Sequence, residues 1–154
     1  MQYTIKENIT FSDVGIHTGV TTNMTLKPAK ENTGIKFVRT DLEGNPIIKA
    51  DVDNVFATDR STSLKKGSAE IHTVEHILAA VSGNEIDNLI IEVDNIEIPI
   101  LDGSSKEFSY EIQKVGTIIQ NEPRKYFEIK RKITFSDETT GTTLIATPAK
   151  NYAL

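Results

Sequence analysis

The sequence contains no cysteine and only three histidines, which are His17, His72 and His76. The lack of cysteine excludes a disulfide framework, and it excludes a thiolate that could bind a metal or act as a nucleophile. Any metal ion must therefore be held by His, Asp or Glu side chains. This donor set suits zinc or another borderline divalent ion.

Long apolar runs are absent as well. No segment reaches the run of about 18 apolar residues that suggests a membrane-spanning helix. The opening MQYTIKENITF has no basic region followed by an apolar one, so we expect no signal peptide. The net charge of −5 argues against nucleic acid as a partner. A length of 154 residues is enough for one domain with a substantial core.

An internal repeat opens the chain and returns near its end. Residues 7–13 read ENITFSD and residues 131–137 read RKITFSD, and each is followed by a Thr-rich segment that ends in PAK. The matched order and similar spacing indicate a duplicated domain. We therefore predict a first domain over residues 1–122. Residues 123–154 would be a linker and the first strands of a second, similar domain.

Hydrophobic periodicity predicts an α+β fold. Residues 3–11 alternate as one strand, and IDNLIIEVDN indicates a buried strand. A helix is predicted over residues 73–82. Its apolar stripe comprises Val74, Ile77, Leu78 and Val81. A second helix is predicted after Ser104, which with Glu107 fits a capping box. Together these elements predict a two-layer domain, a mixed β-sheet with two helices packed on one face.

The segment EIHTVEHILAA, residues 70–80, brings His72, Glu75 and His76 together. On a helix with about 100° per residue, both histidines lie opposite the apolar stripe. One interpretation is a solvated polar face. In a second, His72 and His76 bind zinc at positions i and i+4 with Glu75 as general base, the H-x-x-E-H pattern of inverted zinc peptidases. In a third, only His76 binds the metal and another domain supplies the remaining ligands.

Two long segments resemble one family. The stretch EIHTVEHILAAVSGNEIDNLIIEVDNIEIPILDGSSKEF, with its TVEH, IDN and PILDGS motifs, is similar to the central motif of the UDP-3-O-acyl-N-acetylglucosamine deacetylases, the LpxC family. ITFSDVGIHTGVTTNMTLKPA resembles their opening segment. These are zinc amidases of lipid A biosynthesis in Gram-negative bacteria. The resemblance covers essentially the whole chain. It implies two similar domains of the ribosomal S5 domain 2-like type, with the active site between them.

The resemblance also implies roles for individual residues. His76 would be the zinc ligand of the first domain, and Glu75 the general base that takes a proton from the attacking water. His72 stands where the family's motif has no ligand, so it would be a polar residue on the outer face. The family's other two zinc ligands and its general acid lie in the second domain, and no histidine follows His76 here. We therefore expect an incomplete zinc site and no activity from this chain alone.

Further site residues follow from the same resemblance. His17, in GIHTG, and Ser61, Thr62 and Ser63, in TDRSTSL, match positions near the cleft or the substrate passage. They are candidate substrate-binding residues, with plain turn and strand roles as the alternative. Asp102 is expected to satisfy free amides where the second helix starts, with a place behind the zinc histidine as the alternative.

The expected function is that of the N-terminal half of a zinc deacetylase, located in the cytoplasm. Its partners would be a UDP-linked acylated glucosamine substrate and its own second domain. The alternatives are a complete metallopeptidase of the H-x-x-E-H kind and a non-catalytic interaction module. An exposed interdomain surface could also pair two chains as a dimer through unfinished strands.

Overall fold

The computed structural model describes residues 1–150, which divide into two compact units. The first unit runs from Met1 to Arg124, and the second begins at Lys125. Each unit is described by itself. Among residues 1–150, no helix has the length and hydropathy needed to cross a membrane.

The first unit is built on a five-stranded mixed sheet. Its strands are, in spatial order, β2 (Ile9–Val14), β3 (Thr21–Pro28), β9 (Leu89–Val93), β4 (Ile35–Arg39) and β5 (Ile47–Lys49). Only the β4–β9 pair is parallel, and the other neighbours are antiparallel. β9 therefore lies in the middle of the sheet, which explains why its sequence, LIIEV, is almost wholly apolar.

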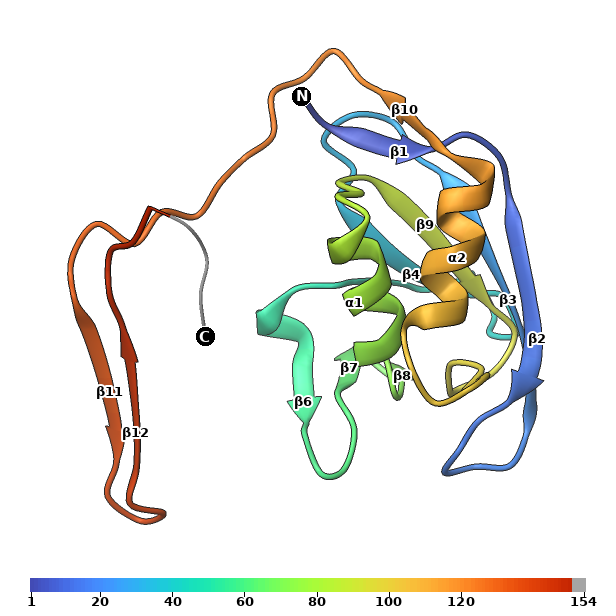
Figure 1. Cartoon of the computed structure of the whole chain (residues 1–154). Helices are drawn as coiled ribbons and strands as arrows, with labels where there is room; N and C mark the ends of the chain where they lie inside the picture. The colour runs from blue at the N-terminus through green and yellow to red at the C-terminus, as the bar shows by residue number, and fades with distance from the viewer. Residues whose placement is uncertain (151–154) are drawn as a thin grey trace. The chain divides into compact units, whose positions relative to one another are not determined.

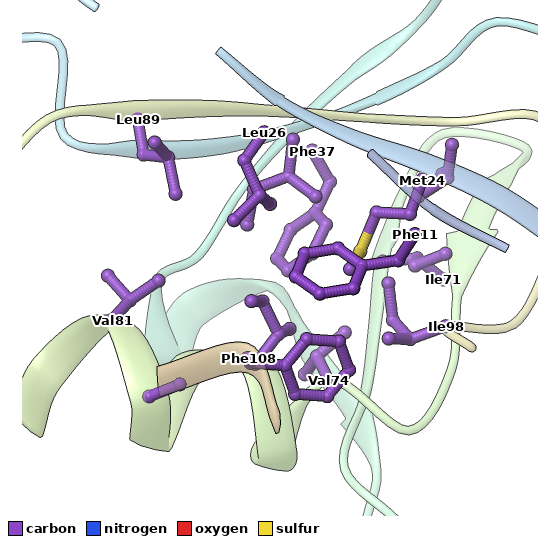
Figure 2. Packing of buried hydrophobic residues seen from close by; sticks show 14 of the residues in the cluster. Phe11, Met24, Leu26, Phe37, Ile71, Val74, Val81, Leu89, Ile98 and Phe108 are labelled. Atoms are coloured by element: carbon purple, nitrogen blue, oxygen red, sulfur yellow. The ribbon is translucent and has the colours of Figure 1, made fainter. Parts of the chain in front are cut away.

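Two helices cover one face of this sheet (Figure 1). They are α1 (Glu75–Gly83) and α2 (Lys106–Val115). The predicted apolar stripe of α1 is directed into the core, where Val74, Ile77 and Val81 are buried and Leu78 packs at the margin. Figure 2 shows this layer, with Phe108 of α2 facing Phe11 of β2. Their rings meet edge to face, with centroids 5.0 Å apart. The predicted α+β class is thus confirmed.

Smaller sheets complete the first unit. β6 (Val55–Ala57), β7 (Ser63–Lys66) and β8 (Ala69–Ile71) form an antiparallel sheet, preceded by a 3-10 turn at Val52–Asn54. β1 (Tyr3–Ile5) pairs with β10 (Thr117–Ile119). The prediction of one strand over residues 3–11 was wrong, because the chain breaks at residues 6–8 and its two parts join different sheets.

Both predicted helix starts were also wrong in detail. α1 begins at Glu75, two residues later than expected, because Thr73 has a left-handed backbone with φ of 62°. α2 does not form the capping box. Instead the Ser104 hydroxyl accepts a hydrogen bond from the Lys106 amide at 3.1 Å, and Ser105 occupies the N-cap position.

The second unit contains one antiparallel hairpin, β11 (Ile133–Asp137) and β12 (Thr142–Ala146). Its register matches that of the β2–β3 hairpin. The pair Ile133↔Ala146 corresponds to Ile9↔Leu26, because ITFSD and PAK recur at the same places around both. In the first unit this pair is buried under the helices, whereas Ile133 is exposed in the second.

Candidate functional site

The start of α1 carries the glutamate–histidine pair. Glu75 and His76 occupy the first two helical positions, and both are half-buried. Thr62 of the neighbouring loop contacts this start twice. Its carbonyl accepts a hydrogen bond from the Val74 amide at 3.2 Å, and its amide donates to Glu75 Oε2 at 2.8 Å. The Glu75 carboxylate is thereby oriented by a backbone group.

His72 does not lie on α1. It belongs to an extended segment that bridges in parallel to Glu97, and its Nδ1 is 2.8 Å from the Ser63 hydroxyl. Its Nε2 lies 3.5 Å from Glu70. The H-x-x-E-H interpretation needs both histidines on one helix. It was wrong, because the left-handed backbone of Thr73 separates His72 from α1. The expectation that His72 is a polar residue on the outer helix face was therefore also wrong, because it contacts the β6–β8 sheet.

A pocket of about 350 Å³ opens beside this segment, and we call it the polar pocket because most of its lining residues are polar, although Phe56, Ala57 and Ile96 also line it. Three of the four candidate substrate residues line it, namely His17, Ser61 and Ser63, together with His72. The fourth, Thr62, contacts Glu75 as described above. The pocket thus has one wall from the turn at residues 15–19 and another from residues 56–63.

A residue that the sequence did not indicate, Glu97, also lines the pocket and is fully buried. Its carboxylate accepts hydrogen bonds from the Thr18 amide at 2.8 Å, the His17 amide at 3.1 Å and the Thr73 hydroxyl at 2.8 Å. Burial raises the pKa of Glu97, but hydrogen bonding from the side chains of Thr18 and Thr73 and from the amides of Thr18 and His17 outweighs it and lowers the pKa below its usual 4.5. The one signal in the sequence was a lone carboxylate between Ile96 and Ile98.

Thr73 adjoins this carboxylate in a conformation that β-branched residues rarely adopt. A left-handed backbone at such a residue costs about 1–3 kcal/mol. The bond to Glu97 offsets part of this cost. Two backbone hydrogen bonds, from the His72 amide to the Ile96 carbonyl and from the Ile98 amide to the His72 carbonyl, tie the preceding residue to the segment at residues 96–98.

Asp102 is exposed and bonds locally. Its Oδ1 accepts from the Ser104 amide at 3.0 Å and from the Ser104 hydroxyl at 2.9 Å, so it shapes the turn before α2. The IDN motif is structural as well. Asp87 accepts from the Tyr3 amide, and Asn88 bonds to Gln2 and Gln120, which ties β1 and β10 to the sheet.

The donor set fits a zinc site only in part. The His76 imidazole is a suitable ligand and Glu75 a suitable neighbouring base. Within residues 1–150, however, no three His, Asp or Glu side chains converge as a metal site requires. A catalytic zinc usually has three protein ligands. This part of the chain would therefore contribute one of them.

Fold and site together define an α+β protein that presents a glutamate–histidine pair at a helix start beside a polar pocket. The family model described as LpxC, UDP-3-O-acyl N-acetylglycosamine deacetylase, matches residues 2–154, and the chain belongs to this family.

Relatives are similar along nearly the whole chain. A bifunctional enzyme LpxC/FabZ of Bacteroides thetaiotaomicron is 44% identical over 99% of this chain and 33% of its own length. A UDP-3-O-acyl-N-acetylglucosamine deacetylase of Citrifermentans bemidjiense is 39% identical over 99% of this chain and 50% of its own. A UDP-3-O-acyl-N-acetylglucosamine deacetylase of Thioalkalivibrio sulfidiphilus is 45% identical over 86% of this chain and 43% of its own length. The chain thus spans a third to a half of the length of these relatives.

Proposed function

We propose that this chain is the N-terminal part of a zinc-dependent deacetylase that removes acetate from UDP-3-O-acyl-N-acetylglucosamine in lipid A biosynthesis. The observation that carries the proposal is the Glu75–His76 pair, held by Thr62 at the start of α1 in a member of this family. Lipid A synthesis implies a Gram-negative source. A nucleotide-sugar substrate implies a cytoplasmic location.

His76 would be the zinc ligand from this part of the protein, and Glu75 would be the general base. Zinc, when bound, supplies a Lewis acid that polarises the amide carbonyl and makes water more acidic. Glu75 takes the proton of the attacking water. The Thr62 amide supports this role because it fixes one carboxylate oxygen and thereby the direction of the other.

The polar pocket would bind part of the substrate. His17, Ser61 and Ser63 offer an imidazole and two hydroxyls to a sugar or a carbonyl. Thr62 would act through Glu75. The acyl chain of the substrate needs a further apolar passage, which we assign to the remainder of the enzyme.

The remainder of the site would come from a second domain of similar build, so the chain as given is expected to be inactive. We propose that residues 1–122 form the first domain, of the ribosomal S5 domain 2-like type, and that residues 123–154 begin the second. The repeated hairpin register supports this duplication.

The test joins residues 1–154 to the C-terminal half of the Citrifermentans bemidjiense relative and measures acetate released from UDP-3-O-acyl-N-acetylglucosamine. Glu75→Gln should lower kcat by about 10²–10⁴-fold while zinc content stays unchanged. His76→Ala should lower zinc content and activity together. The 154-residue chain alone should bind zinc weakly.

Two controls make the result specific. Glu107→Gln removes a carboxylate from the first turn of the other helix and should leave kcat unchanged. His72→Ala should leave the zinc content unchanged, because its imidazole faces Ser63. Full activity in Glu75→Gln would refute its role as base. A joined chain that folds and binds zinc without releasing acetate would favour a non-catalytic interaction module.

A further inference from the structure

The fully buried Glu97 connects two segments that are far apart in the sequence. On one side its carboxylate accepts the amides of His17 and Thr18, and on the other it accepts the hydroxyl of Thr73. The first segment is a wall of the polar pocket, and the second leads directly into Glu75.

We propose that Glu97 is a positioning residue, which holds the turn at residues 15–19 and the start of α1 in fixed relation across the polar pocket. Its importance for the reaction rests on the proposed function. Its structural effect, the immobilisation of the turn, does not.

The turn is built around the carboxylate. A Cβ added at Gly15 would lie 2.2 Å from Glu97 Oε2, so only glycine leaves room for the carboxylate. The turn closes on itself through the Gly19 amide, which donates to the Gly15 carbonyl at 2.8 Å. Gly19 has a φ of 65°, which glycine adopts without strain. Both glycines of GIHTG thus serve one geometry, in which two of the three amides between them, those of His17 and Thr18, are directed at Glu97.

The second segment is held in an equally specific way. Thr73 Oγ1 donates to Glu97 Oε1 at 2.8 Å from a residue with a φ of 62°. This left-handed residue turns the chain from its extended course at His72 into α1. A change at Glu97 therefore reaches Glu75 through two intervening residues, and it reaches His17 directly, because the His17 amide bonds to both oxygens of the carboxylate.

An apolar side chain could fill the same volume, but it could not satisfy these donors. Buried amide and hydroxyl groups without acceptors are costly, and the turn would move outward to find water. Outward movement would displace the His17 imidazole from the pocket. The carboxylate therefore fills space in the core and also fixes the position of the turn at residues 15–19.

Hydrogen exchange in the 154-residue chain tests the immobilisation directly. Glu97→Ala should lower the protection of the His17 and Thr18 amides at least about tenfold, because each loses its acceptor. Glu97→Gln keeps an acceptor oxygen and should retain most of the protection. Gly15→Ala should mimic Glu97→Ala although the carboxylate remains. Glu107→Gln, an exposed change on α2, is the matched control and should leave both amides unchanged.

The Thr73 bond has its own pair of variants. Thr73→Val keeps the shape but loses the hydroxyl, and should increase exchange in the first turn of α1. Thr73→Ser keeps the hydroxyl and should preserve the protection. Equal exchange in these two variants would overturn this half of the proposal.

The kinetic test uses the joined enzyme described above. Glu97→Ala should lower kcat/KM by about 10–100-fold, with most of the loss in KM, and Glu97→Gln should restore most of it. Unchanged exchange at His17 and Thr18 in both Glu97→Ala and Gly15→Ala would overturn the proposal whatever the kinetics. If Glu97→Ala does not fold, the exchange of the His17 and Thr18 amides in Gly15→Ala and Glu97→Gln tests the proposal instead. An inactive parent enzyme would refute the proposed function. The exchange results would still test whether Glu97 immobilises the turn at residues 15–19.

Discussion

Backbone amides donate hydrogen bonds to both carboxylates that the site is built around. The Thr62 amide holds the Glu75 carboxylate, and the amides of His17 and Thr18 hold Glu97. Such bonds need a particular course of the backbone, which in turn depends on residues such as Gly15. We therefore expect substitutions that move the backbone near the site to displace these carboxylates, even where Glu75 and Glu97 themselves are unchanged.

The titration of Glu97 predicts a loss of stability in acid. Its pKa is lowered below the usual 4.5 in the folded state, so the unfolded chain binds the proton more readily. The stabilisation is present above about pH 4.5 and is lost as the pH falls through the folded-state pKa. Glu97→Gln should therefore lose less unfolding free energy than the parent between about pH 6 and pH 3.

Urea unfolding of the 154-residue chain at several pH values would measure this difference. Glu107→Gln also removes one carboxylate, but an exposed one, and serves as the control. Parallel pH profiles for the parent and Glu97→Gln would contradict the prediction.

The Glu75–His76 pair could be proposed as site residues from the sequence, whereas the residues that hold it in place could not. The spacing and resemblance of TVEH indicated Glu75 and His76 as a pair. Nothing in the sequence indicated that Thr62 would face Glu75, because their contact depends on how the β6–β8 sheet folds back. Glu97 was missed for a related reason: one carboxylate in an apolar segment does not reveal which distant amides it will meet.

At the scale of elements, long periodic segments were predictable and short ones were not. The stripe of α1 and the buried strand β9 follow from apolar spacing. β1 and β10 have three residues each, too few to show a period, and they pair only through the chain's return after α2. The start of α1 was misplaced because Thr73 adopts a backbone conformation that its residue type disfavours.

The packing of α2 predicts a large difference between two aromatic residues on one helix. Phe108 is fully buried against Phe11, whereas Tyr110 is exposed. Phe108→Ala should lower the unfolding free energy by about 3–5 kcal/mol, because it leaves a cavity under the helix. Tyr110→Ala, the control, should change it by less than about 0.5 kcal/mol. Equilibrium denaturation measures both, and equal effects would contradict the described packing.

At the scale of the molecule, the two units differ in how much apolar surface they cover. Every residue of the hydrophobic core cluster belongs to the first unit. The hairpin of the second unit exposes its large apolar residues, which are Ile133, Phe135, Leu144 and Ile145. An isolated two-stranded hairpin is marginal in water. The register shared with β2–β3 explains the sequence pattern, since the same strands are covered by helices in the first unit.

This exposed face predicts self-association of the 154-residue chain. Ile133 and Phe135 alternate with polar residues on β11, and Leu144 pairs with Phe135, so one face of the hairpin is apolar. Open strand edges and apolar faces favour pairing with another chain. Sedimentation should therefore show a concentration-dependent dimer.

Two variants test which face is responsible. Phe135→Lys places a charge on the apolar face and should shift the equilibrium to monomer. Thr134→Lys adds the same charge to the opposite face of β11 and should leave the dimer in place. A chain ending at Arg124 should be monomeric and should unfold cooperatively, because the first unit holds the whole core cluster. A parent chain that stays monomeric across the concentration range would mean that the hairpin edges do not pair. Dimers that persist in the shortened chain would instead place the contact on the first unit.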